Sequence, residues 1–206
     1  MDVTVAAFDV DNTLTVRDCV MPFMRRVSGA LVLLRTVVSQ PLTVFSLLKN
    51  KDRNSLKALF VSSVFAGRSE SEVNELGVLF ASRVANGWMR EDVMNRLRWH
   101  QAQGHVVILV SASLSPYLEP LGDLLEVDAV LCTELETDGE TFTGKIRGAN
   151  CRGPEKVRRI QSWCDSARIP MSSVRYAYGD SSGDTEMLAF VENPNYVKKI
   201  ELEMVP

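Results

Sequence analysis

Short apolar segments of strand length constrain the fold of this chain more than any other feature. Val3–Phe8 (VTVAAF) and Val106–Val110 (VVILV) are nearly all apolar and rich in β-branched residues, a composition typical of strands buried on both faces of a parallel sheet. Two more strands are predicted at Ala129–Cys132 and Arg175–Tyr178. Because helical patterns separate these strands, the sequence predicts an α/β fold.

Helical patterns occupy most of the remaining chain. Apolar residues recur at three- and four-residue spacing through 16–97, which predicts a helical block inserted after the first strand. Two shorter helices are predicted at 154–164, with a proline near its start, and at 184–190. The segment 136–146 carries Asp138-Gly139 between β-favouring residues and predicts a hairpin.

One run within the helical block, Ala30–Leu48 (ALVLLRTVVSQPLTVFSLL), is strongly apolar. Its length approaches the roughly 20 residues that cross a bilayer. Arg35 and Pro41 interrupt it, and a proline ends or kinks a helix. We therefore predict two helices buried in the protein here, and we keep peripheral membrane contact through this segment as the alternative.

Composition and charge argue against several classes of protein. The 206 residues are 46% hydrophobic and 24% charged, unlike a disordered or disulfide-rich chain. A net charge of −3 lacks the basic excess of a nucleic-acid-binding domain, so no nucleic-acid partner is predicted. Asp2, Asp9 and Asp11 interrupt the first apolar stretch, so no signal peptide is predicted and a cytoplasmic location is expected.

The cysteines and histidines do not predict a zinc site. The four cysteines are scattered without a CxxC pair, at Cys19, Cys132, Cys151 and Cys164, and we expect reduced, structural thiols. His100 and His105 lie five residues apart and do not share a helical face. They are predicted to be a surface residue and a helix-end residue, not ligands.

Polar residues gather where the predicted strands end. Asp9-Val10-Asp11, Ser111-Ala112-Ser113 and Gly179-Asp180 each follow a strand, and ligands bind at the carboxyl ends of the strands in open α/β sheets. Two carboxylates about 4 Å apart repel by about 4 kcal/mol at an effective dielectric constant near 20. A group of oxygen ligands without His or Cys therefore favours Mg²⁺. A single Asp is equally common in a turn or at a helix start, so the prediction depends on the combination.

That combination resembles, in order, the four motifs of the haloacid dehalogenase (HAD) superfamily. The matching segments are Asp9–Thr15 (DVDNTLT), the strand end at Ser111, Lys156, and Gly179–Asp184 (GDSSGD). The resemblance extends from residue 5 to about residue 190. Its motif order is far more specific than any one motif.

A closer likeness is to the phosphoserine-phosphatase-like branch, subfamily IB. It rests on SAS at 111–113, NCRGPEK at 150–156 and GDSSGDTEML at 179–188. The resemblance implies a three-layer, Rossmann-like (HAD-like) core with a parallel sheet, formed by residues 1–15 and 98–206. An all-helical cap is implied at 16–97.

The resemblance also implies an activity, that of a Mg²⁺-dependent hydrolase of small-molecule phosphomonoesters. Asp9 would be the nucleophile that forms an aspartyl-phosphate, and Asp11 the general acid and base. Ser111 and the backbone N–H of Ala112 would bind the substrate phosphate. Lys156 would screen the nucleophile from the negative substrate. Taken alone, Ser111 would be read as a helix cap and Lys156 as a solvated cation.

The same resemblance assigns the metal ligands. Mg²⁺ would be held by the Asp9 carboxylate, the Asp11 backbone carbonyl and Asp180, while Asp184 would hold metal-bound water or Lys156. Asp18 stands where the phosphoserine phosphatases usually carry a Glu that reads the substrate's amino group. It is therefore the predicted specificity residue of the cap.

Three departures from that branch leave the substrate open. Asp18 replaces the usual Glu, Gly183 replaces a substrate-contacting Asn, and the second motif reads Ser-Ala-Ser instead of Ser-Gly-Gly. The cap is expected to select a phosphoserine-like small phosphate or a lipid phosphate. A phosphate-binding or signalling module without turnover, and a dehalogenase, are the alternatives. The helical insert argues against the module, and Asp11 argues against both.

Overall fold

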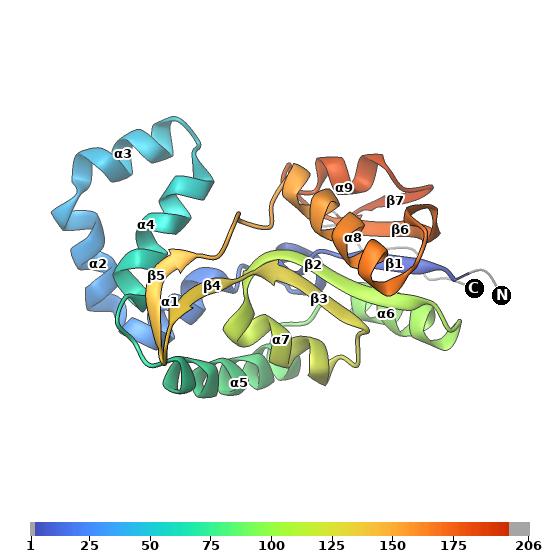
Figure 1. Ribbon diagram of the computed structural model, residues 1–206, viewed down its shortest axis with the longest axis horizontal. Helices are drawn as coiled ribbons and strands as arrows, with labels where there is room; N and C mark the ends of the chain where they lie inside the picture. Colours follow the sequence, from blue (N-terminus) through green and yellow to red (C-terminus); the bar gives the residue numbers. More distant parts are fainter. Residues whose placement is uncertain (1–2, 198–206) are drawn as a thin grey trace.

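A five-stranded parallel sheet lies at the centre of the computed structural model, which describes residues 3–197 (Figure 1). Its strands are β1 (Val5–Phe8), β2 (Val106–Leu114), β3 (Ala129–Thr133), β6 (Val174–Gly179) and β7 (Asn193–Tyr196). They are ordered β3-β2-β1-β6-β7, and every neighbouring pair is parallel. The predicted α/β class and all four predicted strands are confirmed, whereas β7 was not predicted.

Helices cover both faces of the sheet, because residues along each strand alternate between two cores. Ala6 and Phe8 pack toward α6 (Glu91–Ala102) and α7 (Ser115–Leu124). Val5 and Ala7 pack on the opposite face, toward α8 (Pro154–Ala167) and α9 (Thr185–Ala189). Figure 1 shows these helix pairs on either side of the sheet. The predicted three-layer core is therefore confirmed.

Five further helices follow β1 and precede α6, within the segment predicted as a cap. They are α1 (Val20–Ser28), α2 (Ala30–Ser39), α3 (Pro41–Lys49), α4 (Arg53–Phe65) and α5 (Glu70–Gly87). The long helix α5 packs on α7 of the core. This contact needs Gly77, because a Cβ there would lie 1.8 Å from the Pro116 carbonyl oxygen. The inserted helices are therefore anchored directly on the core.

The predicted hairpin forms an antiparallel pair, β4 (Leu135–Asp138) and β5 (Thr141–Ile146). It contacts the inserted helices, because β5 packs on α4 and Phe142 exchanges backbone hydrogen bonds with Gly67 and Arg68. Helix α6 crosses the predicted boundary between cap and core, which lies between residues 97 and 98. It packs on the face of the sheet that carries Ala6 and Phe8. Residues 1–2 and 198–206 of the predicted core lie outside the described residues.

The structure corrects the prediction for the apolar run Ala30–Leu48. Two helices form, as expected, and they meet at Gln40 and Pro41 with a bend of 88°. They are not buried, since Thr36 and Val44 are the only buried residues within them. Periodicity shows which residues of a helix share a face, but not whether another element covers that face. Among residues 3–197 no single helix meets the length and hydropathy of a membrane span, whereas this bent pair does so jointly.

The prediction for His100 was also wrong, because its side chain is completely buried. Its ring nitrogens lie 2.9 Å from the Tyr178 hydroxyl and 2.8 Å from Nδ1 of His105. His105 follows the end of α6 and is half-buried. The four cysteines are free and buried.

Candidate active site

The turn after β1 places Asp9 at the edge of the sheet. The Asp9 backbone N–H donates to the Tyr178 carbonyl at 2.9 Å, which fixes the strand end against β6. The chain then reverses through Val10–Leu14, where Asn12 adopts a left-handed φ of 61°, a conformation that Asn tolerates. This tight turn brings the Thr13 hydroxyl to 3.0 Å from Oδ2 of Asp9, to which it donates. The role of Thr13 was not predicted.

Lys156 holds the other oxygen of Asp9. It lies in the first turn of α8, and its Nζ donates to Oδ1 of Asp9 at 2.7 Å and to Oδ1 of Asp184 at 2.5 Å. Lys156 is 2% exposed, Asp9 6% and Asp184 1%. Burial lowers the pKa of Lys156, but attraction to the two carboxylates outweighs it and raises this pKa above its usual range. The ammonium group is therefore a fixed, permanent positive charge.

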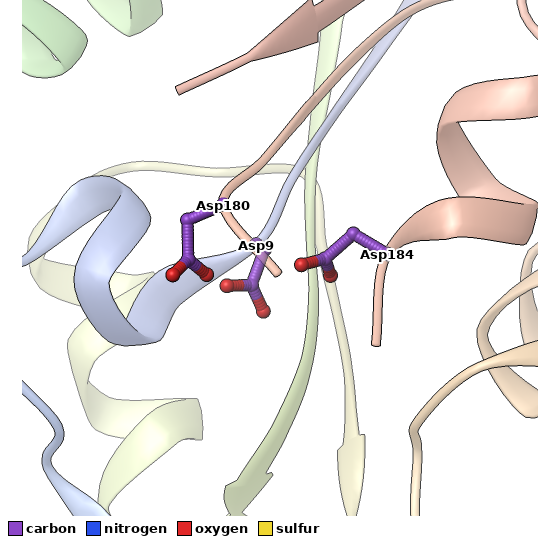
Figure 2. A group of neighbouring side chains, drawn as sticks. All are labelled: Asp9, Asp180 and Asp184. Atoms are coloured by element: carbon purple, nitrogen blue, oxygen red, sulfur yellow. The ribbon is translucent and has the colours of Figure 1, made fainter. Parts of the chain in front are cut away.

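Three carboxyl groups converge at the carboxyl ends of β1 and β6. Oxygens of Asp9, Asp180 and Asp184 lie within 4.8 Å of one another, and Figure 2 shows the Asp9 carboxyl between the other two. Asp184 is fixed further by Ser181, whose N–H and hydroxyl both donate to its Oδ2 at 3.0 Å. With Lys156 as the counter-charge, three ionised carboxylates leave an excess of two negative charges.

This donor set fits a divalent cation such as Mg²⁺, which prefers oxygen ligands. Within the described residues, Asp180 forms no ion pair. Burial, followed by the negative charges of Asp9 and Asp184, raises its pKa to about 6. A dication bound beside Asp9 and Asp180 would relieve that repulsion.

Asp11 does not belong to this group of three carboxyl groups. Its Oδ1 accepts the Cys19 backbone N–H at 2.8 Å, and its Oδ2 accepts the Ser113 hydroxyl at 2.7 Å. Burial raises the pKa of Asp11 to about 7, and the nearby charge of Asp18 adds to this effect. Both protonation states are therefore populated near neutral pH, as acid–base catalysis requires.

A chain of hydroxyl groups orients Asp11. Tyr117 donates to the Ser113 hydroxyl at 2.7 Å, and Ser113 donates in turn to Asp11. The Ser113 backbone N–H donates to the Ser111 hydroxyl at 3.2 Å, which links both serines at the end of β2. Tyr117 was not predicted as a functional residue, and Ser113 was predicted only as part of the polar strand end Ser111-Ala112-Ser113, without a role of its own. The sequence did carry a signal for Ser113, because it places a second hydroxyl-bearing residue two positions after Ser111.

A cavity of about 420 Å³ opens between the sheet edge and the inserted helices. Every predicted site residue lines it: Asp9, Asp11, Asp18, Ser111, Ala112, Lys156, Asp180 and Asp184. Asp18 is exposed, and its Oδ2 accepts the Met21 backbone N–H at 3.1 Å in the first turn of α1. The opposite wall is apolar and comes from the inserted helices, with Val20, Met21, Met24, Leu48, Leu56 and Phe60.

Three basic residues that the sequence analysis missed also line this cavity, namely Arg53, Lys57 and Arg152. The Lys57 ammonium reaches from α4 to the Ala112 carbonyl and, at 2.9 Å, to Oδ1 of Asn150. Asn150 also donates from Nδ2 to Asn54 at 2.8 Å, so it ties α4 to the core. Burial lowers the pKa of Lys57 to about 8.

Gly183 makes room for Arg152. A Cβ at residue 183 would lie 2.2 Å from Nη1 of Arg152, whose Nη2 donates to the Ser182 hydroxyl at 3.1 Å. The glycine that departs from the phosphoserine-phosphatase pattern is therefore matched by a guanidinium group in this sequence. No local pattern in the sequence predicts that pairing.

Comparisons with known proteins agree with this arrangement. A family model described as haloacid dehalogenase-like hydrolase matches residues 6–189. The chain belongs to this family. The HAD hydrolase is 31% identical to Protein CicA of Caulobacter vibrioides over 194 residues, which covers 92% of this chain and 84% of that protein.

Two solved structures share the fold of this HAD hydrolase. A Bordetella pertussis protein of unknown function has a TM-score of 0.73 at 22% identity, covering 92% of this chain and 87% of that one. A phosphoserine phosphatase, solved as a phospho-aspartyl intermediate analogue, has a TM-score of 0.61 at 15% identity, with 93% and 84% covered. The chain is therefore a HAD hydrolase with a phosphoserine-phosphatase-like fold.

Proposed function

We propose that this HAD hydrolase cleaves phosphomonoesters with the help of Mg²⁺ and through an aspartyl-phosphate on Asp9. The observation that carries the proposal is the position of Asp9. Its carboxylate is held by Lys156 and Thr13 in a 420 Å³ cavity that three basic side chains also line. Phosphoryl transfer depends mainly on such positioning and charge neutralisation.

In this mechanism the Asp9 carboxylate attacks phosphorus, an Asp9 oxygen–phosphorus bond forms, and the bond to the leaving oxygen breaks. Asp11 gives its proton to that leaving oxygen, and the Tyr117–Ser113 chain orients it. Asp11 then removes a proton from the water that hydrolyses the acyl-phosphate. Phosphate is released and Asp9 is restored.

Other residues of the site bind and screen charge. Ser111 and the Ala112 N–H are proposed to bind the transferred phosphoryl group. The positive charge of Lys156 would offset the repulsion between the Asp9 carboxylate and the negatively charged phosphate. Asp9, Asp180 and the Asp11 backbone carbonyl would hold Mg²⁺, with Asp184 in an outer position against Lys156. When bound, Mg²⁺ supplies positive charge that neutralises phosphoryl oxygens.

The inserted helices are proposed to form a cap that selects the substrate. The cap would comprise residues 16–90, since α6 packs with the core, and Asp18 would read part of the substrate. A small-molecule substrate and a cytoplasmic location remain predictions from the sequence. Asp11, which accepts a hydrogen bond from the Ser113 hydroxyl, favours a phosphatase over a dehalogenase, because a dehalogenase needs no acid for its leaving group.

The test is phosphate release from an aryl phosphate by the purified chain, with Mg²⁺ and with a chelator. Asp9→Asn should abolish release, whereas Asp123→Asn, which changes an exposed carboxylate on α7, should leave it unchanged. Full activity in Asp9→Asn would refute the nucleophile. A stable phosphorylated protein without phosphate release would instead support a signalling module.

A further inference from the structure

Helices α2 and α3, which meet at a bend, carry an apolar face with no partner within residues 3–197. Its members are Leu31, Leu34, Val38, Leu42, Phe45 and Leu48, each between 58% and 83% exposed. They recur every three or four residues, so they share one side of each helix. Single exposed apolar residues are ordinary, but a continuous patch marks an interaction site.

The opposite side of these helices is supported by the protein. Thr36 and Val44 point inward, and both helices pack on α4 while α2 also contacts α1. Figure 1 shows α2 and α3 at the end of the molecule farthest from β7. The apolar face therefore lies on helices that pack on the rest of the protein, and its side chains are exposed.

The charge around this face has one sign. Residues 19–51 contain five basic residues (Arg25, Arg26, Arg35, Lys49 and Lys51) and no acidic residue, whereas the rest of the chain has a net charge of −8. All five basic residues are exposed. A partner for this region must therefore offer both an apolar surface and negative charge.

A basic groove adjoins the same helices. A cavity of about 800 Å³ beside Leu33 of α2 is lined by four arginines: Arg17, Arg25, Arg26 and Arg83. Two of them lie over the Trp88 ring, Arg17 at 4.7 Å and Arg83 at 5.8 Å. None of the four forms an ion pair with a residue that the structure describes. The groove is thus a second site of uncompensated positive charge, suited to an anionic headgroup.

We propose that the α2–α3 face rests on an anionic lipid bilayer, with the apolar side chains in the acyl boundary and the basic residues at the headgroups. A second copy of this chain fits less well, because it would bring two patches of net charge +5 together. A membrane span does not fit either. Helices of 10 and 9 residues joined at 88° are each about 15 Å long, and the hydrocarbon core is about 30 Å thick.

Docking in this way would place the catalytic cavity at the bilayer. Leu48 of the apolar face also lines that cavity, together with Leu56, Met21 and Met24. An apolar wall thus leads from the docked surface toward Asp9. The corresponding substrate class is a lipid phosphomonoester, and this step rests on the proposed function.

Binding is tested by sedimentation of the full chain with vesicles of phosphatidylcholine mixed with phosphatidylglycerol, and with phosphatidylcholine alone. We expect binding to the anionic vesicles, weakened by salt. Combining Leu34→Ser, Leu42→Ser and Phe45→Ser should lower binding by more than about tenfold, since each change removes an apolar side chain that the bilayer would bury. The matched control combines Val78→Ser, Leu79→Ser and Leu124→Ser, which are 51%, 57% and 48% exposed outside α2 and α3, and it should bind like the wild type.

The outcomes separate docking from catalysis. Neither triple variant changes a residue of the catalytic cavity, so both should hydrolyse a soluble aryl phosphate at the wild-type rate. No vesicle binding, or equal binding by both triple variants, would overturn the docking proposal while leaving the phosphatase proposal intact. Dimerisation that the first triple variant abolishes, without vesicle binding, would assign the face to a second copy instead. Vesicle binding without hydrolysis of a vesicle-borne phosphomonoester would overturn the substrate class alone.

Discussion

The ammonium nitrogen of Lys156 lies 2.7 Å from Oδ1 of Asp9, although 147 residues separate them in the chain. The pair is buried, and Lys156 is shared with Asp184. Removing one partner of a buried ion pair leaves an uncompensated charge and costs about 3–5 kcal/mol. Lys156 is therefore expected to support both catalysis and the folded state.

Lys156→Met should lower the free energy of unfolding by about 3 kcal/mol at pH 7 and lower kcat by at least about 100-fold. Urea denaturation and aryl phosphate hydrolysis measure the two effects. The control is Lys145→Met, because Lys145 is exposed on β5. Equal stability of the two variants would contradict the ion-pair assignment.

Asp11→Asn should slow the cleavage of alkyl phosphates far more than that of aryl phosphates. An alkoxide is a poor leaving group that needs a proton, whereas a nitrophenolate leaves without one. We expect the loss in single-turnover rate to be about 100-fold or more greater for the alkyl substrate. Equal losses for both substrates would show that Asp11 does not act as the leaving-group acid.

Arg152→Ala should raise KM by about tenfold with little change in kcat, because it removes a charged contact from the pocket. Gly183→Ala should act similarly, since its Cβ would displace the guanidinium group. The double variant should then be no worse than Arg152→Ala. Additive losses in kcat/KM would show that Gly183 acts through another group.

The motifs made most of the active site predictable from the sequence, because Asp9 and Asp180 follow β1 and β6, Ser111 lies near the end of β2, and the carboxyl ends of these strands meet at one sheet edge. Buried parallel strands also show up as apolar runs. β7 (NPNY) was missed because it is a polar edge strand of four residues.

The contacts within the site that were not predicted are long-range. Ser113 meets Asp11 from 102 positions away, and Lys57 meets Asn150 from 93 positions away. No local periodicity encodes such pairs. The exposure of α2 and α3 was unpredictable for a similar reason, since it depends on what the remaining chain leaves uncovered.

His100 should make the fold less stable as pH falls. Burial lowers the pKa of His100 to about 3, with His105 and Arg96 contributing, whereas an unfolded His has a pKa of about 6.5. The unfolded state therefore binds a proton that the folded state rejects, and stability is lost as pH falls below about 6.5. His100 should account for a loss of about 2 kcal/mol between pH 7 and pH 5.

Urea denaturation at pH 7 and pH 5 measures this loss. Comparing the wild type with His100→Gln isolates it, because the carboxyl groups that titrate in the same range are present in both proteins. The variant should lose less stability than the wild type over that interval. Identical pH dependence would contradict the burial of a neutral His100.

Mg²⁺ should raise the melting temperature of the wild type, because a cation that binds the folded state stabilises it. Asp180→Asn should reduce this shift sharply, since it removes one of the three converging carboxylates. Asp123→Asn should leave the shift unchanged. A shift as large in Asp180→Asn as in the wild type would place the metal elsewhere.

Trapping the covalent intermediate tests the central proposal most directly. The enzyme is mixed with a phosphomonoester and Mg²⁺, quenched in acid within one turnover, and mapped by peptide mass spectrometry. The proposed mechanism predicts one phosphoryl group on the peptide containing Asp9, formed and lost at rates consistent with turnover. Phosphate release at the normal rate with no phosphoryl group on Asp9, or with the group on another residue, would contradict it.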